Sequence, residues 1–204
     1  TVLLDPSTTQ STAASVHVGL LGQAVHALWR GGFFDATLDS TDVSGVPAGV
    51  SARLTTQLPP AVQIRSGRVE LALGAVNVLL TYPTLFAQPI NAELGARASM
   101  RVQLVGNDLR FDDVRIDELR FSTASVDLDQ ATRDTVETLL TRILGSVVTS
   151  ALNDALPAVP IPAFTLPASL STYGLPGGRD LGLVGPVLTT GSRHFTLAGN
   201  FGLR

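Results

Sequence analysis

The most regular hydrophobic pattern in the chain lies between residues 132 and 156. Apolar side chains recur there at the i, i+3, i+4, i+7 spacing that places them on one face of an α-helix. These positions are Val136, Leu139, Leu140, Ile143, Leu144, Val147, Val148, Ala151, Leu152 and Leu156. Asp129 or Thr132 can accept hydrogen bonds from the first turn, and Pro157 cannot continue the helical ladder. The pattern predicts a long amphipathic helix over 132–156 whose apolar face must be covered.

A shorter helix is predicted near the N-terminus, after a half-buried strand over 16–20. Helical spacing of apolar residues continues through 21–30, and Gly31-Gly32 is typical of a helix end. The apolar positions of this helix are Leu21, Ala24, Val25, Leu28 and Trp29.

The clearest alternation of apolar and polar residues covers 90–104 and predicts a strand of about 50 Å. Gly106-Asn107-Asp108 predicts a turn into a return strand, where the alternation slips at Asp112-Asp113 and at Asp117-Glu118. Such slips indicate bulges, which allow a long sheet to wrap around another element. Shorter strands are predicted over 36–38, 50–58, 61–64, 69–80, 181–188 and 194–203. Both faces of 69–80 carry apolar residues, so part of this strand is expected to be covered on both sides.

These elements predict an α+β fold in which a long, strongly twisted antiparallel sheet wraps around the long helix, with the shorter helix beside it. Residues 1–12 are rich in Thr, Ser, Asp and Pro and are expected to form a flexible segment before a single domain over 13–204. Residues 157–167 contain too many prolines for a helix and are expected to form an extended connector.

Composition narrows the functional classes. Charged residues make up 15% of the 204 residues where about 25% is usual, and the mean hydropathy is +0.30. The apolar excess must therefore line an interior, a cavity or a partner interface. The sequence has no uninterrupted apolar stretch of about 18 residues, so a membrane-spanning helix is not expected. A net charge of −3 gives no field that would attract nucleic acid or anionic membranes.

The chain shows little that indicates catalysis or metal binding. It contains no cysteine, and all 14 basic residues are arginine, which fits either phosphate recognition or a coding bias of the source genome. His17, His26 and His194 have no carboxylate at metal or triad spacing. The acidic residues between 112 and 129 lack the spacing of an EF-hand, and 174–182 does not read as a nucleotide-binding loop. Because no G-x-S-x-G or H-E-x-x-H motif is present, we expect a protein that is not an enzyme. Neither a metal nor a cofactor is expected.

The order of these elements resembles one barrel of the bactericidal/permeability-increasing and lipopolysaccharide-binding proteins, the tubular lipid-binding (TULIP) family, and is most similar to their C-terminal barrel. The segments that carry the resemblance are VHVGLLGQAVHALWRGGFFDATL at 16–38, NDLRFDDVRIDELRFSTAS at 107–125, ALPAVPIPAFTLP at 155–167 and LTTGSRHFTLAGNFGLR at 188–204. The resemblance implies a half-barrel with an apolar pocket for phospholipid or lipid A acyl chains. Members usually carry two such barrels, whereas this chain is expected to hold one, without the N-terminal barrel whose basic tip grips lipopolysaccharide.

The predicted function is therefore binding of a phospholipid, a lipopolysaccharide or a similar amphiphile, for sequestration or transfer. The candidate lipid-binding residues, which could equally pack the core, are Leu21, Val25, Leu28, Trp29, Leu140, Ile143, Leu144 and Val147. A bound phospholipid or fatty acyl ligand is expected. The alternative is an interaction or assembly module whose apolar surface meets a second barrel or a sister copy in a homodimer. A secreted or periplasmic location in a bacterium is the expected setting.

Overall fold

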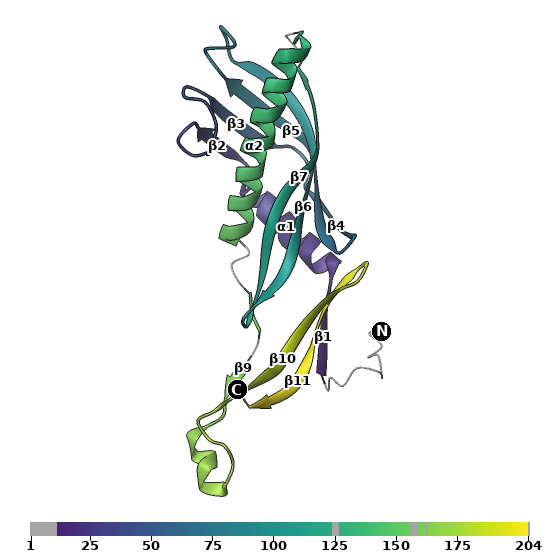
Figure 1. Ribbon diagram of the computed structural model, residues 1–204, viewed down its shortest axis with the longest axis vertical. Helices are drawn as coiled ribbons and strands as arrows, with labels where there is room; N and C mark the ends of the chain where they lie inside the picture. Colours follow the sequence, from purple (N-terminus) through teal and green to yellow (C-terminus); the bar gives the residue numbers. More distant parts are fainter. Residues whose placement is uncertain (1–11, 124–126, 156–158, 162, 204) are drawn as a thin grey trace.

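The computed structural model describes residues 12–123, 127–155, 159–161 and 163–203, and shows two antiparallel sheets that follow each other along the long axis (Figure 1). The seven-stranded sheet has the order β2-β3-β5-β6-β7-β8, with β4 paired to β5, and the four-stranded sheet has the order β1-β11-β10-β9. The strands are β1 Thr12–His17, β2 Ala36–Asp39, β3 Ser51–Thr56, β4 Ala61–Arg65, β5 Arg68–Thr81, β6 Ile90–Val105, β7 Asp108–Thr123, β8 Val159–Pro160, β9 Ala163–Thr165, β10 Asp180–Thr190 and β11 His194–Leu203. The predicted α+β class is confirmed, with two sheets where the pattern predicted one.

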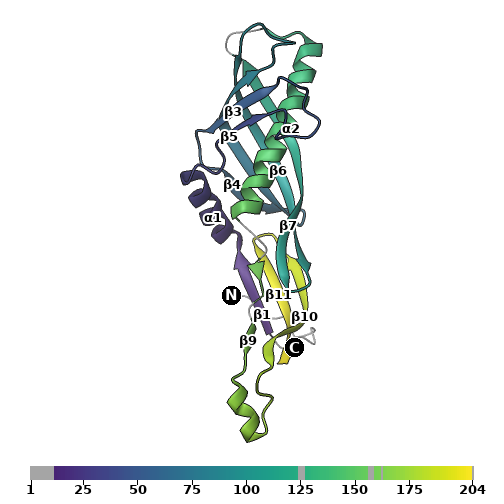
Figure 2. The ribbon, with the colours of Figure 1, turned by 90° about the vertical axis from the view of Figure 1, so that its left-hand side faces the viewer.

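Helix α2, Gln130–Ala155, lies along the seven-stranded sheet (Figures 1 and 2), and its apolar stripe is buried. The buried residues of α2 are Val136, Leu139, Leu140, Ile143, Leu144, Val147, Val148, Ala151 and Leu152. The helix begins two residues before the predicted start, because Asp129 Oδ1 accepts from the Thr132 N–H at 2.8 Å and so satisfies the first turn. The predicted end at 156–157 lies outside the described residues.

Helix α1, Val18–Arg30, begins three residues earlier than the pattern predicts. His17 caps it, since its Nδ1 accepts from the Gly19 N–H at 3.0 Å. The strand predicted at 16–20 is correspondingly displaced to β1, whose six residues all pair with β11. Of the predicted flexible segment 1–12, Thr12 therefore belongs to β1, and residues 1–11 lie outside the described residues.

Strand β5 contains a bulge that the sequence did not reveal. Its register against β6 shifts between Leu73 and Val76, and Ala75 adopts a left-handed conformation with φ of 49°. The extra residue changes the phase of the alternation, so that all the buried apolar residues of β5 lie on one face. These are Val69, Leu71, Leu73, Val76, Val78 and Leu80. The expectation that β5 is covered on both sides was therefore wrong.

The long hairpin of β6 and β7 carries both predicted irregularities. The register shifts between Arg97 and Ala98, opposite Asp117, and between Ser99 and Arg101, opposite Asp113. Asp113 has a φ of 51°, which places it in the left-handed region. These bulges increase the local twist and curve the sheet around α2.

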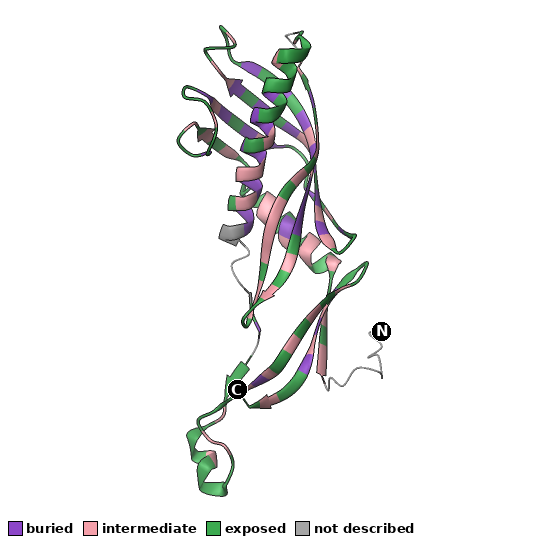
Figure 3. Ribbon diagram, viewed as in Figure 1, coloured by how far each residue is buried: buried purple, intermediate pink, exposed green. Residues whose placement is uncertain are grey.

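The proline-rich segment connects the two sheets. Strand β8 pairs with β7 in the seven-stranded sheet, and β9, directly after it, pairs with β10 in the four-stranded sheet. A short 3-10 helix, η1 Ala168–Tyr173, precedes the loop into β10. Figure 3 shows that buried residues concentrate on α2 and the seven-stranded sheet, whereas the four-stranded sheet and the η1 region are mostly exposed or intermediate.

Candidate functional site

The eight predicted lipid-binding residues all belong to, or pack against, one apolar core cluster. On α2, Leu140, Ile143, Leu144 and Val147 are buried. On α1, Val25 is buried, and the other three residues, Leu21, Leu28 and Trp29, are partly buried. The two helices therefore contribute differently: α2 is a core element, and α1 lies at the margin of the core. A role in lipid contact for these residues stays a prediction.

A narrow crevice lies where α1 meets the end of α2 and the inner face of the sheet. All its lining side chains are apolar: Leu21, Val25, Val62, Val69, Leu71, Met100, Phe111 and Leu152. Of the predicted residues, only Leu21 and Val25 line it. The remaining lining residues lie on strands β4 to β7, except Leu152, which lies on α2 about one turn after Val147. The alternation around 69–71 and 98–102 marks these strand residues as inward-facing, yet nothing in the pattern places them beside α1.

The crevice is closed in this conformation. Its volume is about 10 Å³, which is room for about one water molecule and not for an acyl chain. A hydrocarbon ligand would therefore have to displace one of the walls.

Helix α1 is the wall that is most weakly anchored. Its single fully buried residue is Val25, whereas α2 buries a continuous stripe. One hydrogen bond ties each end of α1 to another element: the Val18 N–H donates to Arg193 O at 2.8 Å, and Trp29 Nε1 donates to Thr56 O at 3.0 Å. Few buried side chains are typical of segments that move at low free-energy cost.

One face of the four-stranded sheet continues the apolar core outward. Residues that pair directly across antiparallel strands lie on the same face, so the register assigns one set to this face. The set comprises Ala14, Val16, Phe164, Leu181, Leu183, Leu188, Phe195, Leu197, Phe201 and Leu203. Phe195, near α1, is 6% exposed, whereas Phe201 is 50% and Phe164 53% exposed. The rings of Phe164 and Phe201 lie 5.9 Å apart. We call this set the apolar sheet face.

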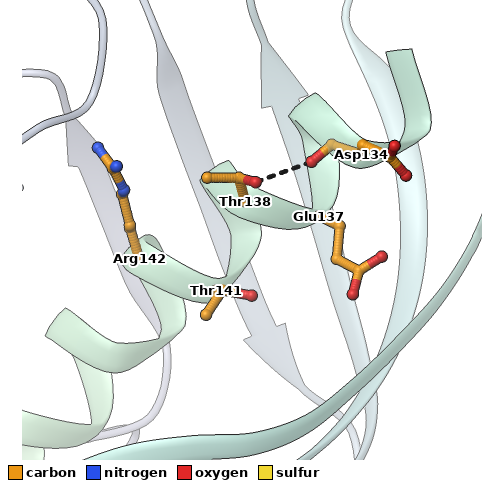
Figure 4. A pocket seen from close by; sticks show the side chains of 5 residues that line it. All are labelled: Asp134, Glu137, Thr138, Thr141 and Arg142. Carbon is orange, nitrogen blue, oxygen red and sulfur yellow. Dashed lines mark hydrogen bonds between the residues drawn. The ribbon is translucent and has the colours of Figure 1, made fainter. Parts of the chain in front are cut away.

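A larger hollow of about 420 Å³ lies on the solvent side of α2 (Figure 4). It is lined by Asp134, Glu137, Thr138, Thr141 and Arg142. Thr138 Oγ1 donates to the backbone carbonyl of Asp134 at 2.9 Å, and the guanidinium of Arg142 donates to the carbonyl of Gly45. Because its lining is polar and charged, this hollow does not suit an acyl chain.

The outer face of the long hairpin carries ion pairs between arginines and carboxylates. Arg110 pairs with Asp108, Arg115 with Asp113, and Arg120 with Glu118. Hydrogen bonds from Arg68 and then from Arg115 lower the pKa of the Asp113 carboxyl below its usual value. Within the described residues, no group of three or more carboxylate and imidazole side chains is placed to hold a metal ion. These acidic residues therefore form a solvated, paired surface.

None of the helices in the described ranges is both long enough and apolar enough to cross a membrane.

Neither a protein-family model nor a curated protein matches the sequence. Among solved structures, the chain is similar to the crystal structure of lipopolysaccharide binding protein, with a TM-score of 0.43 and 10% sequence identity. The alignment covers 95% of this chain and 41% of that chain, so this chain spans less than half the length of that protein. At this identity the likeness concerns the fold alone.

Proposed function

We propose that this protein binds a lipid, and that the acyl chain enters the crevice under α1. The single observation that carries the proposal is the all-apolar lining of the crevice at the margin of the core, where α1 forms one wall. The ligand would be a phospholipid, a lipopolysaccharide or a similar amphiphile, held for sequestration or transfer.

The free energies favour such an exchange. Moving α1 outward uncovers side chains such as Leu21, Val25 and Leu28, each of which is worth about 1.5–3 kcal/mol when fully buried. A dozen methylene groups transferred from water contribute about 10 kcal/mol at about 0.8 kcal/mol each. The bound chain also covers the side chains that α1 uncovers. Apolar contact alone is therefore sufficient to open the crevice.

The apolar sheet face offers the ligand a path into the crevice. Its buried end at Phe195 belongs to the same core cluster as Val25 and Leu152. An acyl chain that enters along this face stays in contact with apolar side chains from Phe201 to the crevice.

The first experiment uses Trp29, which is the chain's single tryptophan and belongs to α1. Titration with phosphatidylcholine vesicles or with lipopolysaccharide should shift the Trp29 emission as α1 moves. Native mass spectrometry of the protein after incubation and removal of the vesicles should show a lipid-sized adduct.

Two leucine-to-tryptophan variants test whether the ligand binds in the crevice. Leu21→Trp fills the crevice and should abolish the adduct. Leu79→Trp makes the same exchange at a residue that is 41% exposed and lies outside the crevice, and it should keep the adduct. Absence of an adduct from the unsubstituted protein, or equal loading of both variants, would contradict the proposal.

The apolar sheet face also favours a second candidate function, as an interaction module that packs against a second barrel or a sister copy. Exposed phenylalanines in a continuous apolar set are typical of protein interfaces. On this alternative, light scattering of the lipid-free protein should show the mass of a dimer or of a complex with a companion barrel. Phe201→Ser should abolish either complex. Leu85→Ser, at an exposed leucine outside this face, is the control. A monomer that loads lipid would exclude the sister-copy form.

A further inference from the structure

A pair of histidines lies at the junction between the four-stranded sheet and α1. His17 ends β1 and His194 begins β11, and the two residues are direct partners in the antiparallel register. Both side chains are exposed, and their ring centres lie 4.9 Å apart. Sequence spacing could not reveal this pair, because the residues come from opposite ends of the chain.

The separation of the rings matches that of two imidazoles on one metal ion. A metal–nitrogen bond of about 2.0–2.1 Å places the ion about 3 Å from each ring centre. Two rings bound at an angle of roughly 90–110° then have centres about 4.5–5 Å apart. From this geometry we infer that His17 and His194 form a two-imidazole site for a first-row divalent transition-metal ion.

The surroundings decide which ions fit. A hollow of about 350 Å³ adjoins His194 and is lined by the hydroxyls of Ser15, Thr189 and Thr196, among others. It leaves space for the water molecules that must complete the coordination of a metal with two protein ligands. Among the residues that the structure describes, no carboxylate lines this hollow, so Ca²⁺ and Mg²⁺, which require oxygen ligands of that kind, are disfavoured. Imidazole nitrogens favour Cu²⁺ over Ni²⁺ and Zn²⁺.

Metal binding at His17 competes with the cap of α1. A neutral imidazole has one nitrogen with a free lone pair and one that carries the proton. His17 Nδ1 uses that lone pair to accept from the Gly19 N–H. Whichever ring nitrogen binds the ion, the lone pair is no longer available to Gly19, and the first turn of α1 loses its cap. The site therefore links metal binding to the order of α1.

The chain offers its own control, because it has three histidines and His26 lies apart from the pair, next to Trp29. Calorimetric titration with Cu²⁺ should give one ion per chain, and electron paramagnetic resonance should show two nitrogen ligands. His194→Ala and His17→Asn should each lower the affinity at least about tenfold. His26→Ala should leave it unchanged, and Mg²⁺ should not bind. Unchanged affinity in the His17 and His194 variants, or an equal loss in His26→Ala, would overturn the inference.

His17→Asn also separates metal binding from folding, since asparagine is itself a good N-cap. Hydrogen exchange of α1, followed by mass spectrometry, should become faster when Zn²⁺ is added to the unsubstituted protein. The same addition should change nothing in His17→Asn. Unchanged exchange in the metal-loaded, unsubstituted protein would overturn the competition with the cap.

Discussion

Arg68 and Asp113 are 45 positions apart in the sequence, and the guanidinium of Arg68 donates both to the Asp113 carboxylate at 2.8 Å and to its backbone carbonyl at 2.6 Å. Arg68 Nε also donates to Ser99 Oγ at 2.9 Å. One side chain at the start of β5 thus holds the bulge of β7 against β6. This bulge is one of the two register shifts of the hairpin.

Replacement of Arg68 by methionine should destabilise the fold by about 2 kcal/mol, because it leaves the nearly buried Ser99 hydroxyl and the Asp113 carbonyl without their donor. Urea denaturation measures the loss. Arg115→Met removes an exposed partner of the same aspartate and should cost less than about 0.5 kcal/mol. Equal losses would show that Arg68 contributes no more than a surface ion pair.

The lowered pKa of Asp113 predicts a specific response to acid. A carboxylate whose pKa in the folded state lies below the unfolded value stabilises the fold above that unfolded value, and this contribution disappears as the pH falls through the folded pKa. Asp113→Asn should therefore have a lower Tm than the unsubstituted protein at pH 7. The difference should shrink below the ordinary aspartate value of 3.8.

Circular dichroism at a series of pH values tests this. Hydrogen bonds also lower the pKa values of Asp39 and Asp129. Both residues are present in the variant and in the unsubstituted protein, so their contributions cancel in the difference in Tm. A difference in Tm that stays constant over this pH range for Asp113→Asn would contradict the assignment.

Truncations should separate the core helix from the movable one. Leu140→Ala removes a side chain that is 1% exposed and should cost about 2–5 kcal/mol. Leu21→Ala, at a partly buried position, should cost about 1 kcal/mol and should increase lipid loading, because it widens the crevice. Urea denaturation and native mass spectrometry give the two readouts. Reduced loading by Leu21→Ala would place the ligand elsewhere.

The tether at the C-terminal end of α1 should also be measurable. Trp29→Phe keeps an aromatic ring but removes the Nε1–H donor to Thr56 O, and should cost about 1 kcal/mol. Hydrogen exchange along α1 should become faster, while that of α2 should not change. Equal acceleration in both helices would mean that α1 does not move independently.

The hydrophobic pattern predicted correctly those elements in which one periodicity holds along the whole element. The stripe on α2 and the alternation of β6 are long and unbroken, so one periodicity fits every inward position. The bulge at Ala75 escaped detection because alanine gives no sign of a left-handed conformation, which usually calls for glycine or asparagine. β1 was misplaced because its strand conformation depends on β11, its partner from the other end of the chain.

The hydrophobic pattern predicts less of the candidate site. Apolar periodicity shows that Ile143 and Leu21 face inward, but not that the first lies deep in the core and the second at its margin. That difference arises from how α1 crosses the sheet, which depends on the His17 cap and on the pairing of β1. The sequence also shows that Phe201 is apolar, but not that it is exposed. Its exposure results from the position of the four-stranded sheet beyond the core.

The pairing of β1 with β11 also sets an order of assembly during synthesis. The hydroxyls of Ser15 and Thr196 are in contact at 2.7 Å across 181 positions of sequence. At about 5–20 residues per second, the ribosome needs roughly 10–40 s after making β1 before its neighbour emerges. The seven-stranded sheet and α2 can form during that interval, whereas β1 cannot join the four-stranded sheet before β11 is made. A nascent chain therefore holds β1 without this neighbour until residues 194–203 have been synthesised.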